Sequence, residues 1–456
     1  MPGLGATIEA HRQGSDHPNP LRVQEGPCHD LEMNSNETDP ILSAAEVSPS
    51  LDAEALHAAM VERIKDRQRK LGAPLPPRVE RALSAVPRHL FTPGAELEAA
   101  YADESVITKT DEGGVNLSAV SAPSTIAGML AQLGVEPGHR VLEIGSGGYN
   151  AALLAELVGP EGEVTTMDID AEVVDRARHC LDQAGYGRVR TVCGDGAFGV
   201  PDFAAYDRLI VTVGTEDIPA AWVDQLAPTG RMVVPLRTRA LMRSWALDRD
   251  GDRLISRSHM MCGFVPMQGA GRHQRNRIDL QGGAVTLWVD EGPDIDAAAM
   301  EKALSSPRAQ AWSGVTRKRG EPFSDQDLWL AITLEGGCVL TATQDAVEQD
   351  VVAPSWRLGT PALVDGANLV YRAKLRPLGE AGDTFEFGAF AHGPDAQRLA
   401  DQLTERFRVW DTHVRSRLQP QMVVYPVGTD AVDLLDGYLV DKLHTRIVLS
   451  WHAPTS

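Results

Sequence analysis

A glycine-rich turn between an apolar run and a helical pattern constrains the fold of this chain most strongly. Residues 141–144 read Val-Leu-Glu-Ile, and glycine follows at positions 145, 147 and 148. Residues 149–158 then carry apolar side chains at helical spacing. Strand, tight turn and helix in this order open a doubly wound α/β domain, whose ligands bind beside the turn. The glycines allow close approach to the backbone, and the helix N-terminus offers free N–H groups.

The residues around the turn indicate which ligand it binds. A dinucleotide fingerprint would place a third glycine at position 150, where this chain has Asn150. Glu143, at the strand end, also disfavours a phosphate group. An acid beside a glycine turn suits a ligand with an amino group and ribose hydroxyls, such as S-adenosylmethionine. An ordinary strand-to-helix turn without a ligand is the alternative.

Two further acidic residues end the next predicted strands. Residues 164–170 end in Asp168, about twenty residues past the glycines, where a carboxylate can accept from both ribose hydroxyls. Residues 190–196 contain Asp195, which can accept from an adenine amino group. A fourth strand over 206–213 and a helix, turn and fifth strand over 222–235 continue the α/β pattern. Three acids at three successive strand ends indicate a nucleoside site.

Several separate motifs keep the order found in one enzyme family. They are Val-Pro-Arg-His-Leu-Phe at 86–91, Ala-Tyr-Ala-Asp at 100–103, Val-Ser-Ala-Pro at 120–123, the 141–148 turn, Gly-Asp-Gly at 194–196 and Phe-Val-Pro at 264–266. Over roughly residues 75–275 the chain resembles the protein-L-isoaspartate O-methyltransferases. Gly-Gly-Tyr-Asn and residues 262–271 are similar to the subgroup that modifies ribosomally made peptides, including the FxLD-type methyltransferases of lanthipeptide and graspetide pathways.

The resemblance implies a catalytic role for Ser121. Methyl transfer from a sulfonium is an in-line displacement, so the enzyme must align the nucleophile and exclude water. A carboxylate is already ionised at neutral pH and needs no general base. Ser121 would donate to one carboxylate oxygen and direct the other toward the methyl group. Without the resemblance, a serine here is more often a helix N-terminal cap, and Ser124 is the better candidate for that cap.

The predicted cofactor is S-adenosylmethionine, and no metal is expected, because the thirteen histidines form no His-Glu-x-x-His pair. The predicted cofactor-binding residues are Val120, Pro123, Glu143, Gly145, Ser146, Gly147, Gly148, Asp168, Ile169, Asp195, Gly196 and Thr212.

Charge and cysteine content narrow the partners and the compartment. The net charge of −20 disfavours binding to nucleic acid or to an anionic membrane. The five cysteines are scattered and odd in number, which suits a reducing cytoplasm. We find no signal peptide and no apolar run of membrane-spanning length. The expected location is therefore cytoplasmic, and the resemblance implies a peptide or an isoaspartyl protein as the partner.

The composition divides the chain into three parts. Residues 1–48 are rich in proline and acids and are expected to form a disordered tail. Residues 49–277 form the predicted methyltransferase domain. Residues 278–456 are expected to form a separate α+β domain, whose role is either peptide recognition or dimerisation and packing support.

The expected elements of that C-terminal domain come from local patterns. Strands are predicted at 284–289, 328–334, 369–375 and 384–390, and a long helix is predicted over 395–417.

Two clusters of basic residues stand out in the acidic chain. They comprise Arg237, Arg239 and Arg243, then Arg272, Arg275 and Arg277. Such clusters are usually solvated surfaces, and the alternative is docking of an acidic leader peptide.

These observations predict an S-adenosylmethionine-dependent carboxyl O-methyltransferase. Its expected substrate is an aspartyl or isoaspartyl side chain of a ribosomally synthesised peptide. The resemblance implies that the methyl ester would promote closure to a succinimide, which either persists or hydrolyses to isoaspartate. A repair enzyme for aged proteins, a non-catalytic cofactor-binding scaffold and a small-molecule methyltransferase are the alternatives.

Overall fold

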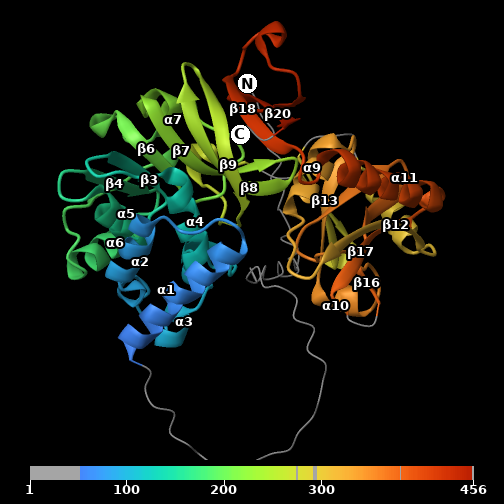
Figure 1. Ribbon diagram of the computed structural model, residues 1–456, viewed down its shortest axis with the longest axis horizontal. Helices are drawn as coiled ribbons and strands as arrows, with labels where there is room; N and C mark the ends of the chain where they lie inside the picture. The colour runs from blue at the N-terminus through green and yellow to red at the C-terminus, as the bar shows by residue number, and fades with distance from the viewer. Residues whose placement is uncertain (1–51, 274–275, 291–294, 380–381, 454–456) are drawn as a thin grey trace, which may run out of the picture.

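Two large sheets organise the protein. The computed structural model describes residues 52–273, 276–290, 295–379 and 382–453. These residues contain a ten-stranded sheet and an eight-stranded sheet, and Figure 1 shows them in two lobes. The tail expected at residues 1–48 lies outside the described residues.

The first sheet has the doubly wound order predicted for the methyltransferase domain. Its strands run β5-β4-β3-β6-β7-β8-β9, parallel from β5 to β7 and antiparallel beyond. The bounds are β3 Arg140–Ile144, β4 Glu163–Asp168, β5 Arg190–Cys193, β6 Tyr206–Val211, β7 Leu226–Thr238, β8 Leu241–Asp250 and β9 Arg253–Met261. From β3 the chain forms β4 and β5 on one side of that strand, and it then returns to form β6 and β7 on the other side. Ligands bind at such a reversal, at the carboxyl ends of the strands.

Helices cover one face of this sheet around a shared core. They are α1 (Ala53–Lys70), α2 (Pro77–Ala85), α4 (Pro123–Leu133), α5 (Tyr149–Val158) and α6 (Ala171–Gln183). Within β3, Val141 joins this core, whereas Leu142 joins the core on the opposite face. This alternation is expected of a strand buried on both sides. A short helix, α7 (Ala220–Gln225), contributes Trp222 to the opposite core.

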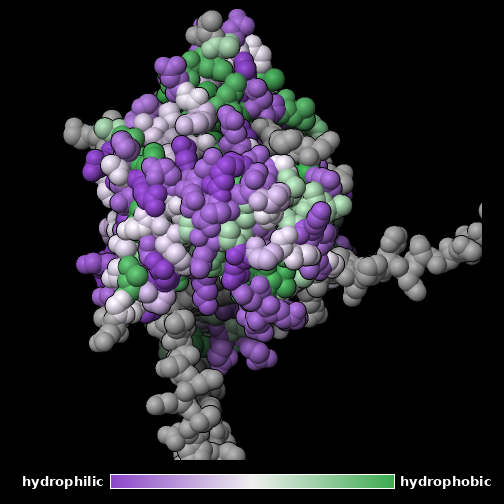
Figure 2. Space-filling view, turned by 90° about the vertical axis from the view of Figure 1, so that its right-hand side faces the viewer, coloured by the Kyte–Doolittle hydropathy of each residue, from purple (hydrophilic) through white to green (hydrophobic). Residues whose placement is uncertain are grey.

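The second sheet is wholly antiparallel, in the order β10-β11-β13-β14-β15-β17-β12 with β16 beside β17. The bounds are β10 Asn276–Leu280, β11 Val285–Val289, β12 Ala309–Lys318, β13 Gly337–Ala342, β14 Thr360–Asp365, β15 Asn368–Arg372, β16 Arg376–Leu378 and β17 Thr384–His392. Its helices are α8 Ala297–Leu304, α9 Ser324–Thr333, α10 Gln344–Glu348 and α11 Ala396–Val409, the last continuing into a π-helical turn over Trp410–Val414. The side of the molecule that this lobe presents is largely hydrophilic (Figure 2).

The strand predicted at 328–334 is wrong, because α9 occupies these residues. Residues 326–332 of α9 are all buried, so apolar side chains follow one another without helical spacing. A short apolar run of this kind cannot be told from a buried strand by periodicity alone. Asp325 and Asp327 in the first turn favour the helix through its dipole.

Three strands near the C-terminus return to the first sheet. β18 (Gln419–Pro426) pairs with β9, β20 (Thr445–His452) pairs with β18, and β19 (Tyr438–Asp441) forms the outer edge. The predicted domain of residues 278–456 therefore does not coincide with one sheet, because β18–β20 belong to the first sheet. Pairing with β18 satisfies backbone groups of β9 that would otherwise remain at an open edge.

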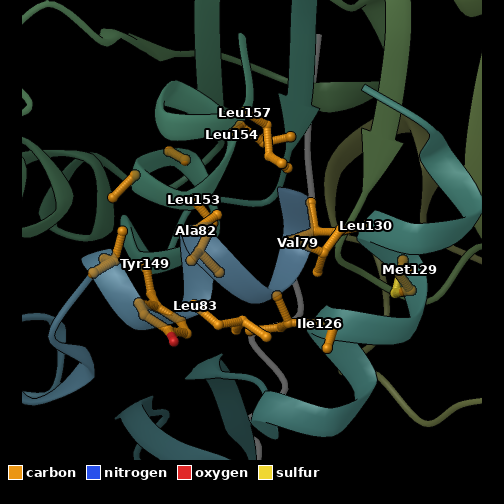
Figure 3. Close-up of a cluster of buried hydrophobic side chains, with 14 of the residues drawn as sticks. Val79, Ala82, Leu83, Ile126, Met129, Leu130, Tyr149, Leu153, Leu154 and Leu157 are labelled. Atoms are coloured by element: carbon orange, nitrogen blue, oxygen red, sulfur yellow. The ribbon is translucent and has the colours of Figure 1, made fainter. Parts of the chain in front are cut away.

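The core under the covering helices is closely packed. Figure 3 shows Tyr149 and Leu153 of α5 on one side of α2, which carries Leu83, and Leu130 of α4 on its other side; all four belong to one buried cluster. Each of these four side chains is at most 1% exposed. This packing fixes α4 and α5, whose N-terminal ends border the carboxyl edge of the sheet.

A buried ion pair joins α9 to both lobes. Arg372 of β15 lies 2.5 Å from Asp327 of α9, and both side chains are buried. Arg243 of β8, also buried, donates to the Ser324 carbonyl (3.0 Å) and lowers the pKa of Asp327, as Arg372 does. Burial outweighs both cations and raises the pKa of the Asp327 carboxyl.

Asp327→Ala should strongly destabilise the protein, because Arg372 would remain buried without its carboxylate. Removal of one partner of a buried pair costs roughly 3–5 kcal/mol in the free energy of unfolding. Asp365→Ala is the control, because Asp365 pairs with Arg398 and both are about half exposed; its cost should be at most about 1 kcal/mol. Urea denaturation measures both values, and equal losses would contradict the argument.

Candidate active site

The glycine turn lies between β3 and α5, beside the carboxyl end of β6. Gly145 has φ +95°, and a Cβ there would lie 2.7 Å from Oγ1 of Thr212. That hydroxyl donates to the Gly145 carbonyl (2.6 Å). Gly148 has φ +82° and precedes α5. Thr212 therefore supports the turn from the neighbouring strand, and position 145 requires glycine.

The Glu143 side chain faces the protein interior, whereas the sequence pattern placed it among the predicted cofactor-binding residues. Its side chain is 1% exposed and accepts from Nδ2 of Asn150 (2.8 Å) and Oγ1 of Thr166 (2.6 Å). Burial raises the pKa of the Glu143 carboxyl to about 7. Asn150, which replaces the third glycine of a dinucleotide fingerprint, thus ties α5 to β3. Glu143 holds the turn in place from within the core.

Asp168 lies where the sequence predicts a ribose-binding acid. Its oxygens accept the backbone N–H groups of Ser146 and Asp170, each at 3.0 Å, so it links the glycine turn to the end of β4. Each carboxylate oxygen retains a second acceptor position. Burial raises the pKa of the Asp168 carboxyl above its usual range. The adjacent Ile169 is 38% exposed and provides an apolar surface beside this carboxylate.

Asp195 joins two loops, and its predicted bond to an adenine amino group stays a prediction. Its Oδ1 accepts from the Ala197 N–H (3.0 Å), and its Oδ2 accepts from the Ala270 N–H (2.7 Å). Gly269 has φ +71°, and a Cβ there would overlap the Asp195 carboxylate. Gly196 is buried against Ile144, with no space for a side chain. The turn that follows the Phe-Val-Pro segment is thereby fixed beside the end of β5, and the Gly214 N–H donates to the Val265 carbonyl within that segment (2.8 Å).

Ser121 stands between β2 (Asn116–Val120) and α4, next to the glycine turn. Val120 is buried, and a Cβ at Gly147 would lie 3.5 Å from its Cγ2. Pro123 begins α4. The cap predicted for Ser124 is wrong, because α4 has no side-chain cap of its own. Instead, Oδ1 of Asp103 accepts from the Ser124 N–H at 2.9 Å.

Arg88 is a residue that sequence reasoning passed over. It is fully buried and donates to the carbonyls of Glu104 (2.9 Å), Val120 (3.1 Å), Ser121 (3.2 Å) and Ala100. Desolvation lowers the pKa of the guanidinium to about 10, so it stays charged at neutral pH. An arginine inside the apolar 86–91 motif was the signal for such a role. Arg88 fixes the backbone that carries Ser121.

Three of the six clustered arginines form contacts within the protein. Arg237 pairs with Glu216 (2.8 Å), Arg243 is buried against α9, and Arg277 pairs with Asp279 (2.6 Å). Arg275 lies outside the described residues. These contacts do not favour docking of an acidic leader peptide.

Neither a metal cluster nor a membrane-spanning helix is found among the described residues. No group of three or more His, Cys, Asp or Glu side chains within them is arranged to hold a metal ion. None of their helices is both long and apolar enough to cross a membrane.

Comparison with known proteins identifies the family. Residues 58–272 match the family described as Protein-L-isoaspartate(D-aspartate) O-methyltransferase. The chain is 40% identical over 211 residues to the protein-L-isoaspartate O-methyltransferase of Methanopyrus kandleri, which covers 46% of this chain and 91% of the relative. It is 38% identical over 219 residues to protein-L-isoaspartate O-methyltransferase 2 of Archaeoglobus fulgidus, covering 48% and 97%. The chain belongs to this family.

A solved structure shares the same broad similarity. It is a Plasmodium falciparum protein-L-isoaspartate O-methyltransferase in complex with S-adenosyl-L-homocysteine, 17% identical, with a TM-score of 0.41 over 46% of this chain and 98% of that one. Membership of the family, shown by the relatives above, makes the protein an S-adenosylmethionine-dependent methyltransferase, and the motif-based family prediction is confirmed. None of the relatives named above is described as a peptide-modifying methyltransferase of the subgroup that the sequence resembled. The second sheet and β18–β20 lie beyond the matched residues.

Burial of Glu143 should make stability depend on pH. Its folded pKa of about 7 exceeds the model-compound value of 4.5, so the folded state binds this proton more tightly. The contribution is present below about pH 4.5 and is lost as pH rises through 7. Between about pH 4.5 and 8, the wild type should lose about 3 kcal/mol of unfolding free energy relative to Glu143→Gln.

Denaturant titrations of both proteins across this pH range measure the difference. Glu98→Gln on the exposed side of α3 (Leu97–Tyr101) is the control for loss of one carboxylate. Parallel pH profiles for the wild type and Glu143→Gln would show that Glu143 stays ionised when buried.

Proposed function

We propose that this protein methylates the free carboxylate of isoaspartyl residues in proteins or peptides. The observation that carries this proposal is the 40% identity with a protein-L-isoaspartate O-methyltransferase over 91% of that relative's length. The position of Ser121 beside the glycine turn supports it, because acceptor and methyl donor must meet within one site. In the methyl ester the carbonyl becomes open to attack by the following backbone nitrogen, and methanol leaves with the amide proton as the succinimide forms.

The residues of the carboxyl edge fit S-adenosylmethionine. Gly147 has no neighbour closer than 3.5 Å to an added Cβ, so its backbone can be approached closely. Asp168 would accept from the ribose hydroxyls with its remaining lone pairs, and Ile169 would cover an adenine face. Supporting positions of the same site are Val120, Pro123, Gly145, Ser146, Gly148, Gly196 and Thr212. In this proposal Glu143 and Asp195 act on the loops around the cofactor.

The protein's own contribution to the chemistry is orientation. When bound, S-adenosylmethionine supplies an electrophilic methyl group on a sulfonium. The Ser121 hydroxyl donates to one oxygen of the substrate carboxylate and leaves the other aligned for attack. Arg88 fixes the Ser121 carbonyl, so the hydroxyl is held at a constant place relative to the glycine turn. No proton has to be removed, because the carboxylate is ionised at neutral pH.

Peptide maturation is the second candidate. Its support is the second sheet, which lies beyond residues 58–272 and offers a surface for recognising a particular precursor. The relatives named above support the repair activity better. Both candidates use the same methyl transfer, so the substrate distinguishes them.

Substrate choice tests the proposal by mass spectrometry. We expect methylation of an isoaspartyl peptide in the presence of S-adenosylmethionine and no methylation of its aspartyl twin. A cyclised precursor from a neighbouring biosynthetic locus is the third substrate. Methylation of that precursor alone, followed by loss of methanol and hence a net loss of one water from the starting peptide, would replace repair by maturation. Methylation of none of the three would refute both.

Ser121→Ala should separate catalysis from cofactor binding. Loss of one oriented donor is expected to lower kcat about 100-fold. Calorimetric affinity for S-adenosylmethionine should stay within about twofold, because the hydroxyl acts on the carboxylate rather than on the cofactor. Ser84→Ala on α2, whose hydroxyl donates to the Glu80 carbonyl (3.0 Å), is the matched control. Unchanged turnover in Ser121→Ala would rule out the assigned role.

A further inference from the structure

The strand β19 forms an open edge of the ten-stranded sheet. Within the described chain it pairs with β20 on one side and with no strand on the other. An open edge presents unpaired N–H and C=O groups, which favour pairing with another strand. This edge belongs to the β18–β20 extension at the top of Figure 1, outside the family match.

One hydrogen bond fixes which backbone groups of β19 face outward. The Lys442 N–H donates to the Thr445 carbonyl of the adjoining turn (2.8 Å), so Lys442 faces β20. Along an antiparallel strand the backbone N–H and C=O groups of successive residues point alternately toward and away from the partner strand, and the β19–β20 register has no shift. Residues 438 and 440 therefore also bond to β20. The N–H and C=O groups of Gly437, Leu439 and Asp441 point away from the sheet.

Exposed apolar side chains gather around the same edge. Ten large hydrophobic side chains are notably exposed among the described residues, and five of them fall between positions 427 and 443. They are Val427, Leu435, Tyr438, Leu439 and Leu443. Figure 2 shows hydrophobic surface at the top of the molecule, where Figure 1 places β18–β20. Such a patch marks an interaction surface.

We propose that β19 pairs antiparallel with β19 of a second copy of this chain. A two-fold axis at Leu439 places Leu439 opposite itself and Gly437 opposite Asp441 of the second copy. These are the three residues whose backbone groups face outward, so every outward group in this segment gains a partner. Each such pair exchanges two hydrogen bonds. The two ten-stranded sheets become one continuous sheet.

Side chains in this register are complementary to themselves. Asp436 falls opposite Lys442 of the second copy, and the symmetry repeats the pair at the other end. Within the described residues neither Asp436 nor Lys442 forms an ion pair. Leu435 comes near Leu443 of the second copy, which covers the most exposed side chain of the patch, at 79%. Opposite charges and apolar contacts that match only about this axis favour a second copy over an unrelated strand.

Sedimentation velocity of the full chain over a range of concentrations tests the dimer. We expect a species of twice 49.2 kDa that dissociates on dilution. Leu439→Pro should give a monomer, because proline removes an outward N–H and leaves the bonds to β20 intact. Leu71→Ala, at another exposed leucine (56%), is the control and should still dimerise. Circular dichroism of each variant reports whether the fold is retained.

A charge exchange tests the register independently of strand disruption. Asp436→Lys and Lys442→Asp should each weaken dimerisation about tenfold, because each places like charges opposite one another twice. The double variant should restore the wild-type dissociation constant. A monomer at every concentration would overturn the proposal, and so would a dimer unaffected by Leu439→Pro and by both charge variants.

Discussion

Parallel pairing between β3 and β6 is the constraint on which the site depends. The register sets Ile144 opposite Val211, so the next residues, Gly145 and Thr212, meet at the carboxyl edge. Thr212 then donates to the Gly145 carbonyl and occupies the space that a side chain at 145 would need. A shift of one residue in this register would exchange the side chains that β3 presents to the two cores. The glycine turn is thus placed by the sheet as much as by its own sequence.

Polar side chains around the turn hold backbone segments in place. Glu143 bonds to α5 and β4, Asp195 bonds to two short helical turns, and Arg88 bonds to four carbonyls. Glu143 and Arg88 are buried, which is costly for a charged group, and both are retained with hydrogen-bond partners. Their common effect is to fix backbone segments that meet at the carboxyl edge. The position of Ser121 therefore depends on side chains such as Arg88, which hold the backbone around it.

Much of the first sheet could be predicted, because its strands are short, buried and separated by helical patterns. The acids at 143, 168 and 195 were correctly placed at strand ends. The hydrogen-bond partners of these acids could not be read from the sequence. Thr166, which donates to Glu143, and Ala270, whose N–H donates to Asp195, are both distant in the chain. The return of β18 to β9 depends on a pairing across more than 150 residues. Local periodicity carries no information about such pairings.

The second sheet is attached near the same edge that carries the glycine turn. Residues of the β7–β8 turn pack against it, and the Ala240 N–H donates to Asp290 just beyond β11. The next residues of β8 reach back toward the site, because a Cβ at Gly214 would collide with Met242. Gly214 follows Thr212 by two positions. One continuous line of contacts therefore joins the support of the glycine turn to the second sheet. A substrate large enough to touch both would gain binding energy from the second sheet and alignment from Ser121, whereas a short isoaspartyl peptide would use the alignment alone.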